Sequence, residues 1–217
     1  MLAPFIGIER HRITTDGQGV TTLAAFHGCP LRCRYCLNPQ CLSDNIDYTT
    51  MTPLELYDKV AIDNLYFIAT GGGVTFGGGE PLLYSKFIRE FCVIAPQEWN
   101  IRIETSLNTY SRHITDILPF IEHWYIDIKD MDDRIYRGYT GKSNKKVIEN
   151  LKLLASHTPQ ESITIRLPLI PNYNDQEKLK ANLKELKGMG FKNFDSFNYI
   201  TYEHNKDNRN GKHANDE

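Results

Sequence analysis

The sequence has no long hydrophobic run and no dominant charge. None of its apolar stretches approaches the ~20 residues that a membrane-crossing helix requires, and the N-terminus lacks the basic start and apolar core of a signal peptide. Lys and Arg number 25 against 27 Asp and Glu, a formal net charge of −2. No global positive field therefore favours nucleic acid or an anionic membrane. We expect a cytoplasmic protein with neither partner.

The cysteine content is too low and too uneven for a disulfide framework. There are only five cysteines, an odd number, and three of them, Cys29, Cys33 and Cys36, fall within eight residues. Such crowding in a reducing compartment favours metal binding. Cys92 lies on the apolar stripe of an expected helix, and we interpret it as a small buried hydrophobe. Cys41 is either a competing ligand or a spare loop thiol.

What the sequence does contain is an alternation of strand-like and helix-like segments over 217 residues, enough for one compact domain. The expected strands are 20–26, 74–76, 101–104, 124–128, 163–167 and 194–200. The expected helices are 52–64, 82–92, 111–121, 147–154 and 179–189. The first of these helices begins with a capping box at Thr52 and Glu55.

Alternating strands and helices imply an α/β fold with parallel pairing through right-handed crossovers. An open, partial (β/α)6 barrel fits the length better than a complete eight-fold barrel, which needs ~250 residues. A flat doubly wound sheet is the alternative that the pattern leaves open. We expect the barrel domain to span residues 1–202, and the polar residues 203–217 to form a disordered tail.

Both architectures place the functional site at the carboxyl ends of the strands, and the chemically distinctive residues follow the strands there. The cysteine loop, residues 28–39, follows the first expected strand. A glycine run, 77–80, follows the second, and 104–108 follows the third. Asp127 and Lys129 stand at the end of the fourth. We therefore expect these segments to meet.

The cysteine spacing, C-x3-C-x2-C on one loop, indicates a 4Fe-4S cluster. Three thiolates hold three of the irons, and the fourth iron is left open to bind a small molecule and pass it an electron. Zinc is the rival, because His27 or Cys41 can complete a four-ligand set. Structural zinc more often uses two separated C-x2-C pairs, and no second pair occurs here. The spacing favours a redox enzyme.

The pattern Cys29-x3-Cys33-x2-Cys36, with Tyr35 before the last cysteine, resembles the radical S-adenosylmethionine superfamily. Within it, the chain is most similar to activating enzymes of glycyl radical enzymes. The segments that carry this resemblance are 16–19, 28–39, 72–82, 104–108 and 127–131. Gln18 stands where members of the family commonly have Pro.

The resemblance implies which residues hold S-adenosylmethionine. They are Tyr35, Gly78, Gly79, Glu80, Glu104, Thr105, Asp127, Lys129 and Arg166. The glycines would lie beside the methionine amino group, where backbone must approach the ligand closely. Lys129 and Asp127 would meet the ligand carboxylate, with a monovalent cation, or they form a structural ion pair. Tyr35 would lie near the adenine or simply pack. No side chain is assigned a catalytic role beyond the cluster and cofactor.

The implied activity is that of a radical activase. Reductive cleavage of S-adenosylmethionine at the cluster gives methionine and a 5′-deoxyadenosyl radical, which removes a hydrogen from a glycine Cα of a partner glycyl radical enzyme. The sequence has no insert for further clusters, so a flavodoxin or ferredoxin is the expected electron donor. The alternatives are a radical enzyme acting on a small molecule, similar to a deazaguanine synthase, and a non-catalytic iron–sulfur or zinc module. The contribution of Tyr199 to His204 is not assigned.

Overall fold

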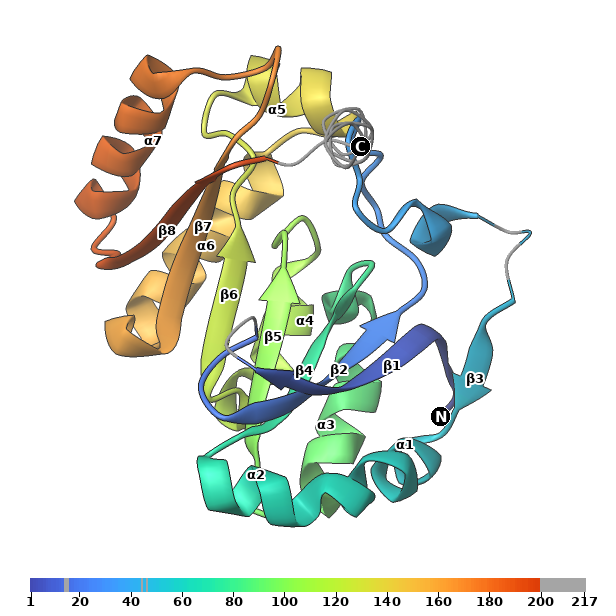
Figure 1. Ribbon diagram of the computed structural model, residues 1–217. Helices are drawn as coiled ribbons and strands as arrows, with labels where there is room; N and C mark the ends of the chain where they lie inside the picture. The colour runs from blue at the N-terminus through green and yellow to red at the C-terminus, as the bar shows by residue number, and fades with distance from the viewer. Residues whose placement is uncertain (14–15, 44, 46, 200–217) are drawn as a thin grey trace, which may run out of the picture.

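The computed structural model describes residues 1–13, 16–43, 45 and 47–199, and its centre is one twisted sheet (Figure 1). The strands lie in the order β3-β1-β2-β4-β5-β6-β7-β8. Their bounds are β1 Ala3–Ile13, β2 Val20–Phe26, β3 Thr49–Met51, β4 Gly73–Gly78, β5 Asn100–Thr105, β6 His123–Asp127, β7 Ile163–Leu169 and β8 Asn193–Asn198. The helices are α1 Pro53–Val60, α2 Asn64–Thr70, α3 Ser85–Ile94, α4 Ser111–Thr115, α5 Asp133–Thr140, α6 Lys145–His157 and α7 Gln176–Gly188.

The predicted partial barrel is confirmed. Strands β2, β4, β5, β6, β7 and β8 pair in parallel, each with the next, and a helical connection lies between successive members. All six predicted strands are present, and each end lies within two residues of the predicted one. The expected strand 194–200 ends at Asn198, and residues 200–217, including most of the predicted tail, lie outside the described part of the chain.

Two strands and two helices, α2 and α5, were not predicted; the first expected helix reaches only the first residue of α2, Asn64. β1 and β3 add an antiparallel edge to the parallel sheet, with β1 paired to both β2 and β3. The sequence of β1 has no sustained alternation because its register with β2 shifts twice. α5 was missed because it is short and contains Gly138, which weakens helix propensity.

The first predicted helix is correct at its start and too long at its end. Thr52 Oγ1 accepts a hydrogen bond from Glu55 N at 3.2 Å, and the Glu55 carboxylate accepts one from Thr52 N at 2.7 Å, which forms the expected capping box. The α-helix then ends at Val60, and a 3-10 turn over Ala61–Asp63 leads into α2.

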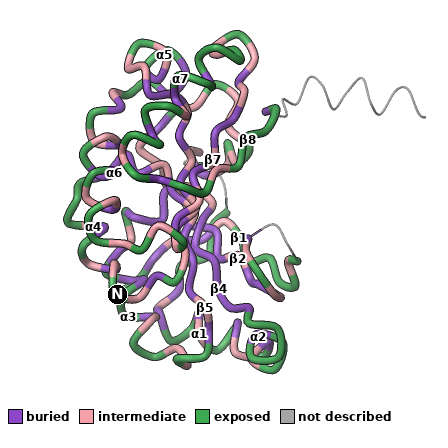
Figure 2. The backbone as a smooth tube through the Cα atoms, turned by 90° about the vertical axis from the view of Figure 1, so that its left-hand side faces the viewer, coloured by how far each residue is buried: buried purple, intermediate pink, exposed green. Residues whose placement is uncertain are grey.

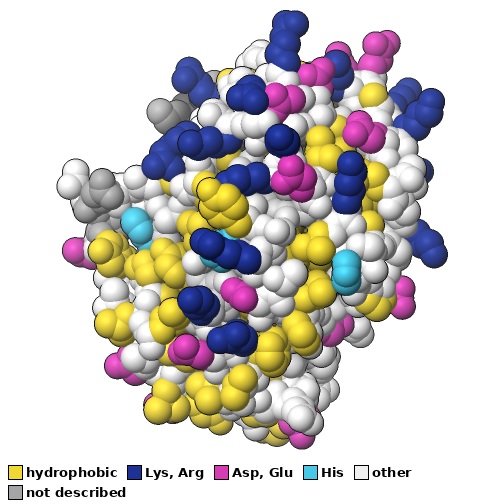
Figure 3. All heavy atoms as spheres, turned by 180° about the vertical axis from the view of Figure 1, so that it is seen from behind, with side chains coloured by type: hydrophobic (Ala, Val, Ile, Leu, Met, Phe, Trp, Pro, Cys, Tyr) yellow, Lys and Arg dark blue, Asp and Glu magenta, His cyan; other side chains and the backbone are white. Residues whose placement is uncertain are grey.

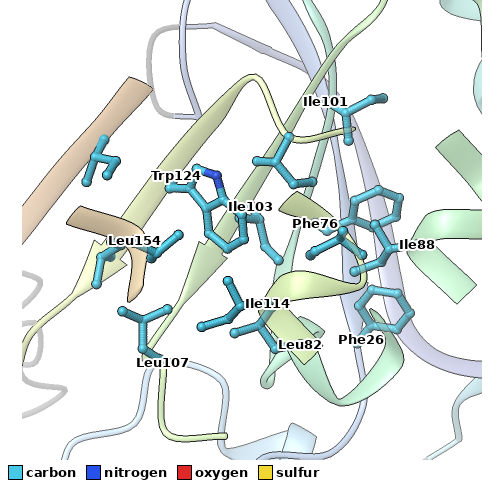
Figure 4. Packing of buried hydrophobic residues seen from close by; sticks show 14 of the residues in the cluster. Phe26, Phe76, Leu82, Ile88, Ile101, Ile103, Leu107, Ile114, Trp124 and Leu154 are labelled. Atoms are coloured by element: carbon cyan, nitrogen blue, oxygen red, sulfur yellow. The ribbon is translucent and has the colours of Figure 1, made fainter. Parts of the chain in front are cut away.

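The core lies between the sheet and the helices that cover it, where buried segments follow the strands (Figure 2). Phe26, Phe76 and Trp124 come from successive parts of the sheet, and Ile88 and Leu154 come from the covering helices (Figure 4). The rings of Phe26 and Phe76 stack with centroids 5.7 Å apart. Each such side chain removed from water contributes roughly 1.5–3 kcal/mol. This packing fixes where the strands end.

The parallel register brings the carboxyl ends of the strands to one edge. Phe26 at the end of β2 lies opposite Gly78 of β4, and Asp127 of β6 lies opposite Arg166 of β7. The loops that follow therefore start side by side. In the described residues, no helix has both the length and the apolar character that a bilayer crossing demands.

Candidate functional site

A cavity of about 420 Å³ opens at the carboxyl edge of the sheet. Ten of the twelve residues that the sequence predicted for the site line it: Cys29, Cys33, Cys36, Gly78, Gly79, Glu104, Thr105, Asp127, Lys129 and Arg166. They come from the ends of β2, β4, β5, β6 and β7, as the fold requires. Glu80 and Tyr35 do not line the wall. The parallel sheet thus gathers residues that span more than 130 positions of sequence.

Backbone hydrogen bonds hold the cysteine loop from three sides. Gly28 N donates to Cys41 O at 2.8 Å, which closes the loop on itself. Glu80 N donates to Gly28 O at 2.8 Å and ties the loop to the one after β4. Arg32 N donates to Thr140 O at 2.9 Å, which ties it to the end of α5. The three thiols are thereby presented to one cavity.

The three cysteines of the motif fit the donor set of an iron–sulfur cluster. All three are free thiols and half-buried. Burial raises the pKa of Cys29 to about 12 and the pKa of Cys33 to about 11. Iron binds the thiolate, so assembly of a cluster here releases protons. Cys41 also lines the cavity, but its thiol is buried and donates to Phe26 O at 3.5 Å.

His27, the other residue considered for a fourth ligand, is directed elsewhere. Its Nε2 lies 3.0 Å from Ser43 O, and its ring stacks against Tyr48 with centroids 4.8 Å apart. The residue is absent from the described cavity wall. Cys92, predicted as a small buried hydrophobe, is half-buried on α3 and packs against the main core.

The glycines after β4 permit a contact that no other residue allows. A Cβ on Gly79 would lie 2.1 Å from Gly28 O, and a Cβ on Gly78 would lie 2.8 Å from Ala25. Gly78 also has φ +90°, a conformation that disfavours side chains. The loops after β2 and β4 therefore touch backbone to backbone at the cavity, so that main-chain groups face its interior.

Glu80 is fully buried behind this wall and braces it. Its carboxylate accepts hydrogen bonds from Thr105 Oγ1 at 2.6 Å, from Ser106 Oγ at 2.6 Å and N at 3.0 Å, and from Leu82 N at 3.2 Å. Burial raises the pKa of Glu80, and these donors act against that rise. Glu80 thus joins the loop after β4 to the loop after β5.

Two ion pairs cross the cavity wall. Arg166 Nη1 lies 2.8 Å from Glu104 Oε1, and Lys129 Nζ lies 3.2 Å from Asp127 Oδ2. Burial raises the pKa of Glu104, and the charge of Arg166 opposes this rise. Burial alone would lower the pKa of Lys129, but the nearby Asp127 and Cys33 raise it, so Lys129 stays charged. The wall can therefore meet a zwitterion with charges of both signs.

Tyrosines close the cavity beside Cys33. Tyr199, which the sequence did not assign, lines the wall, and its hydroxyl donates to Tyr35 O at 2.7 Å. The Tyr35 ring packs at an angle to the rings of Tyr139 and Tyr173, with ring centroids 6.2 and 6.1 Å away. Ser106, Asp195 and Phe197 also line the cavity without having been predicted. Ser106 follows the end of β5, whereas Asp195 and Phe197 lie within β8, where nothing local in the sequence marks them as cavity residues.

Comparison with known proteins agrees with this architecture. The family model of the radical SAM superfamily matches residues 24–182. The chain is 28% identical to the (2S)-3-sulfopropanediol dehydratase activating enzyme of Klebsiella oxytoca, covering 74% of this chain and 69% of that protein. It is 30% identical to the pyruvate formate-lyase 1-activating enzyme of Escherichia coli strain K12, covering 79% and 70%.

A solved structure shows the same fold at low sequence identity. Streptococcus suis SuiB bound to S-adenosylmethionine superposes with a TM-score of 0.63 at 14% identity, over 86% of this chain and 46% of SuiB. The chain thus spans less than half of that protein and about seven tenths of the two activating enzymes. From the extent of the family match, this chain belongs to the radical SAM superfamily. The family implies a 4Fe-4S cluster and S-adenosylmethionine as its cofactors.

Proposed function

We propose that this chain activates a glycyl radical enzyme by the reductive cleavage of S-adenosylmethionine. The observation that carries the proposal is the convergence of three free thiols, a glycine-lined loop contact and two ion pairs on one cavity. Its curated relatives are activating enzymes, among them an isethionate sulfite-lyase activating enzyme. We assign residues 1–202 to the catalytic domain and place the protein in the cytoplasm.

In this proposal Cys29, Cys33 and Cys36 hold three irons of a 4Fe-4S cluster. When bound, the cluster supplies one electron to the sulfonium, giving methionine and a 5′-deoxyadenosyl radical that takes a hydrogen from a glycine Cα of the partner. The chain's own task is to align the sulfonium and exclude other C–H groups and water. A flavodoxin or ferredoxin supplies the electron.

The remaining wall residues bind S-adenosylmethionine. Backbone at Gly78 and Gly79 meets the methionine amino group, and Glu80 holds that backbone in place. Lys129 and Arg166 attract the carboxylate, and Thr105 supports the same wall.

Glu104 and Asp127 would repel the carboxylate, so we propose that a monovalent cation joins them to it. Tyr35, whose carbonyl accepts a hydrogen bond from the cavity residue Tyr199, is assigned to the adenine. This assignment leaves no further side chain with a catalytic role.

The decisive experiment is anaerobic. The chain is reconstituted with iron and sulfide, reduced with dithionite and given S-adenosylmethionine, and 5′-deoxyadenosine is measured. We expect product from the intact chain, neither cluster nor product from Cys33→Ala, and both from the matched control Cys92→Ala. A reduced, intact cluster that forms no 5′-deoxyadenosine would refute the proposal, as would anaerobically purified protein that holds only zinc. A glycyl radical signal in a partner by electron paramagnetic resonance distinguishes an activase from an enzyme of small molecules.

A second variant tests the ligand assignment. Lys129→Met should retain the cluster and bind S-adenosylmethionine roughly 10- to 100-fold more weakly, since a hydrogen bond to a charged group contributes about 1.5–3 kcal/mol. Loss of Lys129 also leaves Asp127 facing the ligand carboxylate. Lys192→Met, at an exposed position, is the matched control. Affinity equal to that of the unchanged protein would show that Lys129 only pairs with Asp127.

A further inference from the structure

The positive charge of this chain is concentrated beside the cysteine loop. Residues 28–40 and 134–146 together contain seven Lys and Arg and no Asp or Glu, in a protein whose net charge is −2. The first segment is the cysteine loop and the second comprises most of α5 and the start of α6. None of the Lys and Arg side chains of these two segments lines the cavity. Their charge therefore has no role in the cavity as described above.

The two segments form one surface. Arg32 N donates to Thr140 O at 2.9 Å, and Arg34 N donates to Tyr139 O at 3.0 Å, so the loop runs along the end of α5. We call the exposed side chains of this surface the basic face, and they are Arg32, Arg34, Arg134, Arg137 and Lys142. Figure 3 shows Lys and Arg side chains, with some Asp and Glu among them, over the upper part of the rear of the molecule, the end at which Figure 1 places α5 and α7.

The charges of the basic face are largely uncompensated. Arg137 pairs with Asp133 at 2.6 Å, but the other four form no ion pair with any described residue. Arg32 instead donates from Nη1 to Cys29 O at 2.8 Å, within the loop. Exposed like charges held close together repel one another. A partner of opposite charge would reduce this repulsion, and it would be attracted to the basic face before contact.

The basic face lies behind the thiols rather than in the cavity. Leu31, Cys33 and Cys36 line the cavity, whereas Arg32 and Arg34, between and beside them, do not. The loop therefore presents its sulfur atoms inward and its arginines outward. A partner on the basic face is close to the cluster and leaves the cavity open.

We propose that the basic face is the docking surface for an acidic one-electron carrier protein, whose reduced flavin or iron–sulfur centre lies within an acidic rim. In the docked complex one electron passes to the cluster, which is reduced by one electron while the carrier is oxidised by one, and no atom is transferred. This inference rests on the proposed function, because only a chain with a reducible cluster needs such a carrier.

The test compares three charge reversals with a matched control. The variant Arg34→Glu/Arg137→Glu/Lys142→Glu leaves the cavity wall unchanged, and its intactness is checked by iron content and by 5′-deoxyadenosine formation with dithionite. The control, Lys180→Glu/Lys184→Glu/Lys192→Glu, reverses three exposed charges, two on α7 and one shortly after it, and so has the same net charge as the test variant. Two quantities are measured with an acidic flavodoxin at low and high salt: the affinity of the oxidised carrier, and the rate at which the reduced carrier bleaches the cluster absorbance.

At low salt, we expect the triple variant to bind the oxidised carrier about 10-fold more weakly and to be reduced by the reduced carrier about 10-fold more slowly. Both quantities should depend less on salt than in the unchanged protein, because ions screen the attraction between opposite charges. The dithionite reaction and the control should be unchanged. Wild-type reduction rate and salt dependence in the triple variant would overturn the inference. The inference would also be overturned if the triple variant lost binding to duplex DNA or to vesicles containing phosphatidylserine while its reaction with the carrier stayed unchanged. Failure of the dithionite reaction in the unchanged protein would instead refute the proposed function.

Discussion

At the scale of single residues, the pKa values of two buried carboxylates are shifted in opposite directions, although burial by itself raises both. Asp63 pairs with the guanidinium of Arg10, which donates to it at 2.6 and 2.7 Å, and His11 Nε2 lies 2.8 Å away. Its pKa is lowered, chiefly by the bonds from Arg10. Glu80 meets only neutral donors, and burial raises its pKa. The surroundings of Asp63 therefore favour the charged carboxylate, whereas those of Glu80 favour the neutral acid.

Asp63 should make the stability of the protein sensitive to acid. Its folded pKa lies below the unfolded value, so its stabilisation is present above the unfolded pKa and is lost as the pH falls through the folded one. We expect Asp63→Asn to lower the free energy of unfolding by about 2 kcal/mol at pH 7, less than the ~3–5 kcal/mol of a fully buried pair, because Arg10 is partly exposed. The difference from wild type should shrink below about pH 4.

Urea denaturation at a series of pH values measures this effect. Asp58→Asn, at an exposed position of α1, is the control and should change the unfolding free energy by no more than about 0.5 kcal/mol. A constant difference between wild type and Asp63→Asn from pH 7 to pH 3 would show that Asp63 contributes by packing rather than by charge.

At the scale of elements, the site depends on the contact between two loops. The loop after β2 and the loop after β4 join through Gly79 N to Phe26 O at 2.9 Å and Glu80 N to Gly28 O at 2.8 Å. The loop after β5 joins them through Ser106 and the buried Glu80. The loops after the neighbouring strands β2, β4 and β5 are therefore hydrogen-bonded to one another. A change in the backbone of one of these loops should displace the other two.

Gly79→Ala should disturb both loops at once. The new Cβ would fall 2.1 Å from a backbone oxygen that cannot rotate away, so we expect a loss of about 1–3 kcal/mol in stability and weaker retention of iron. Gly188→Ala is the matched control, because no atom lies within 4 Å of its Cβ position, and stability should stay level or rise by up to about 1 kcal/mol. Chemical denaturation and iron content measure both. Equal iron retention in the two variants would contradict the role of this contact.

At the scale of the whole molecule, a well-packed sheet supports the loops at the carboxyl ends of its strands, where the cavity opens. Phe26 and Trp124 are fully buried in the core beneath the edge, while the cysteine loop above them is held by a few backbone hydrogen bonds. Stability is then unevenly distributed, with the loop opening more readily than the strands. A group that binds only the folded loop should stabilise that part most.

Cluster assembly should therefore protect one region. We expect anaerobic reconstitution to slow amide exchange in residues 28–41, where the N–H groups of Arg32 and Arg34 donate to Thr140 O and Tyr139 O, with little change in β5 and β6. Removal of iron with a chelator should reverse the effect. Exchange measured by mass spectrometry on both forms tests this, and uniform protection across the sheet would indicate global tightening instead.

Local patterns predicted much of this structure. The strand at 163–167, with alternating apolar and polar residues, and the capping box at Thr52 depend on neighbours in sequence, and both predictions were correct. β1 was missed because its pairing with β2 shifts register, a property of two strands rather than one. Tyr199 was left unassigned because nothing near it in sequence shows that its hydroxyl reaches Tyr35, 164 positions earlier.

The sequence by itself determined the class of chemistry, since the spacing of Cys29, Cys33 and Cys36 specifies thiol donors whatever the fold around them. It also determined the α/β alternation, because side-chain periodicity acts within each segment. Only the tertiary structure decided which charges pair, that Glu80 is a buried brace, and that Arg32 and Arg34 face away from the thiols beside them. Those properties depend on distances between separate strands and loops, which packing and the parallel register set.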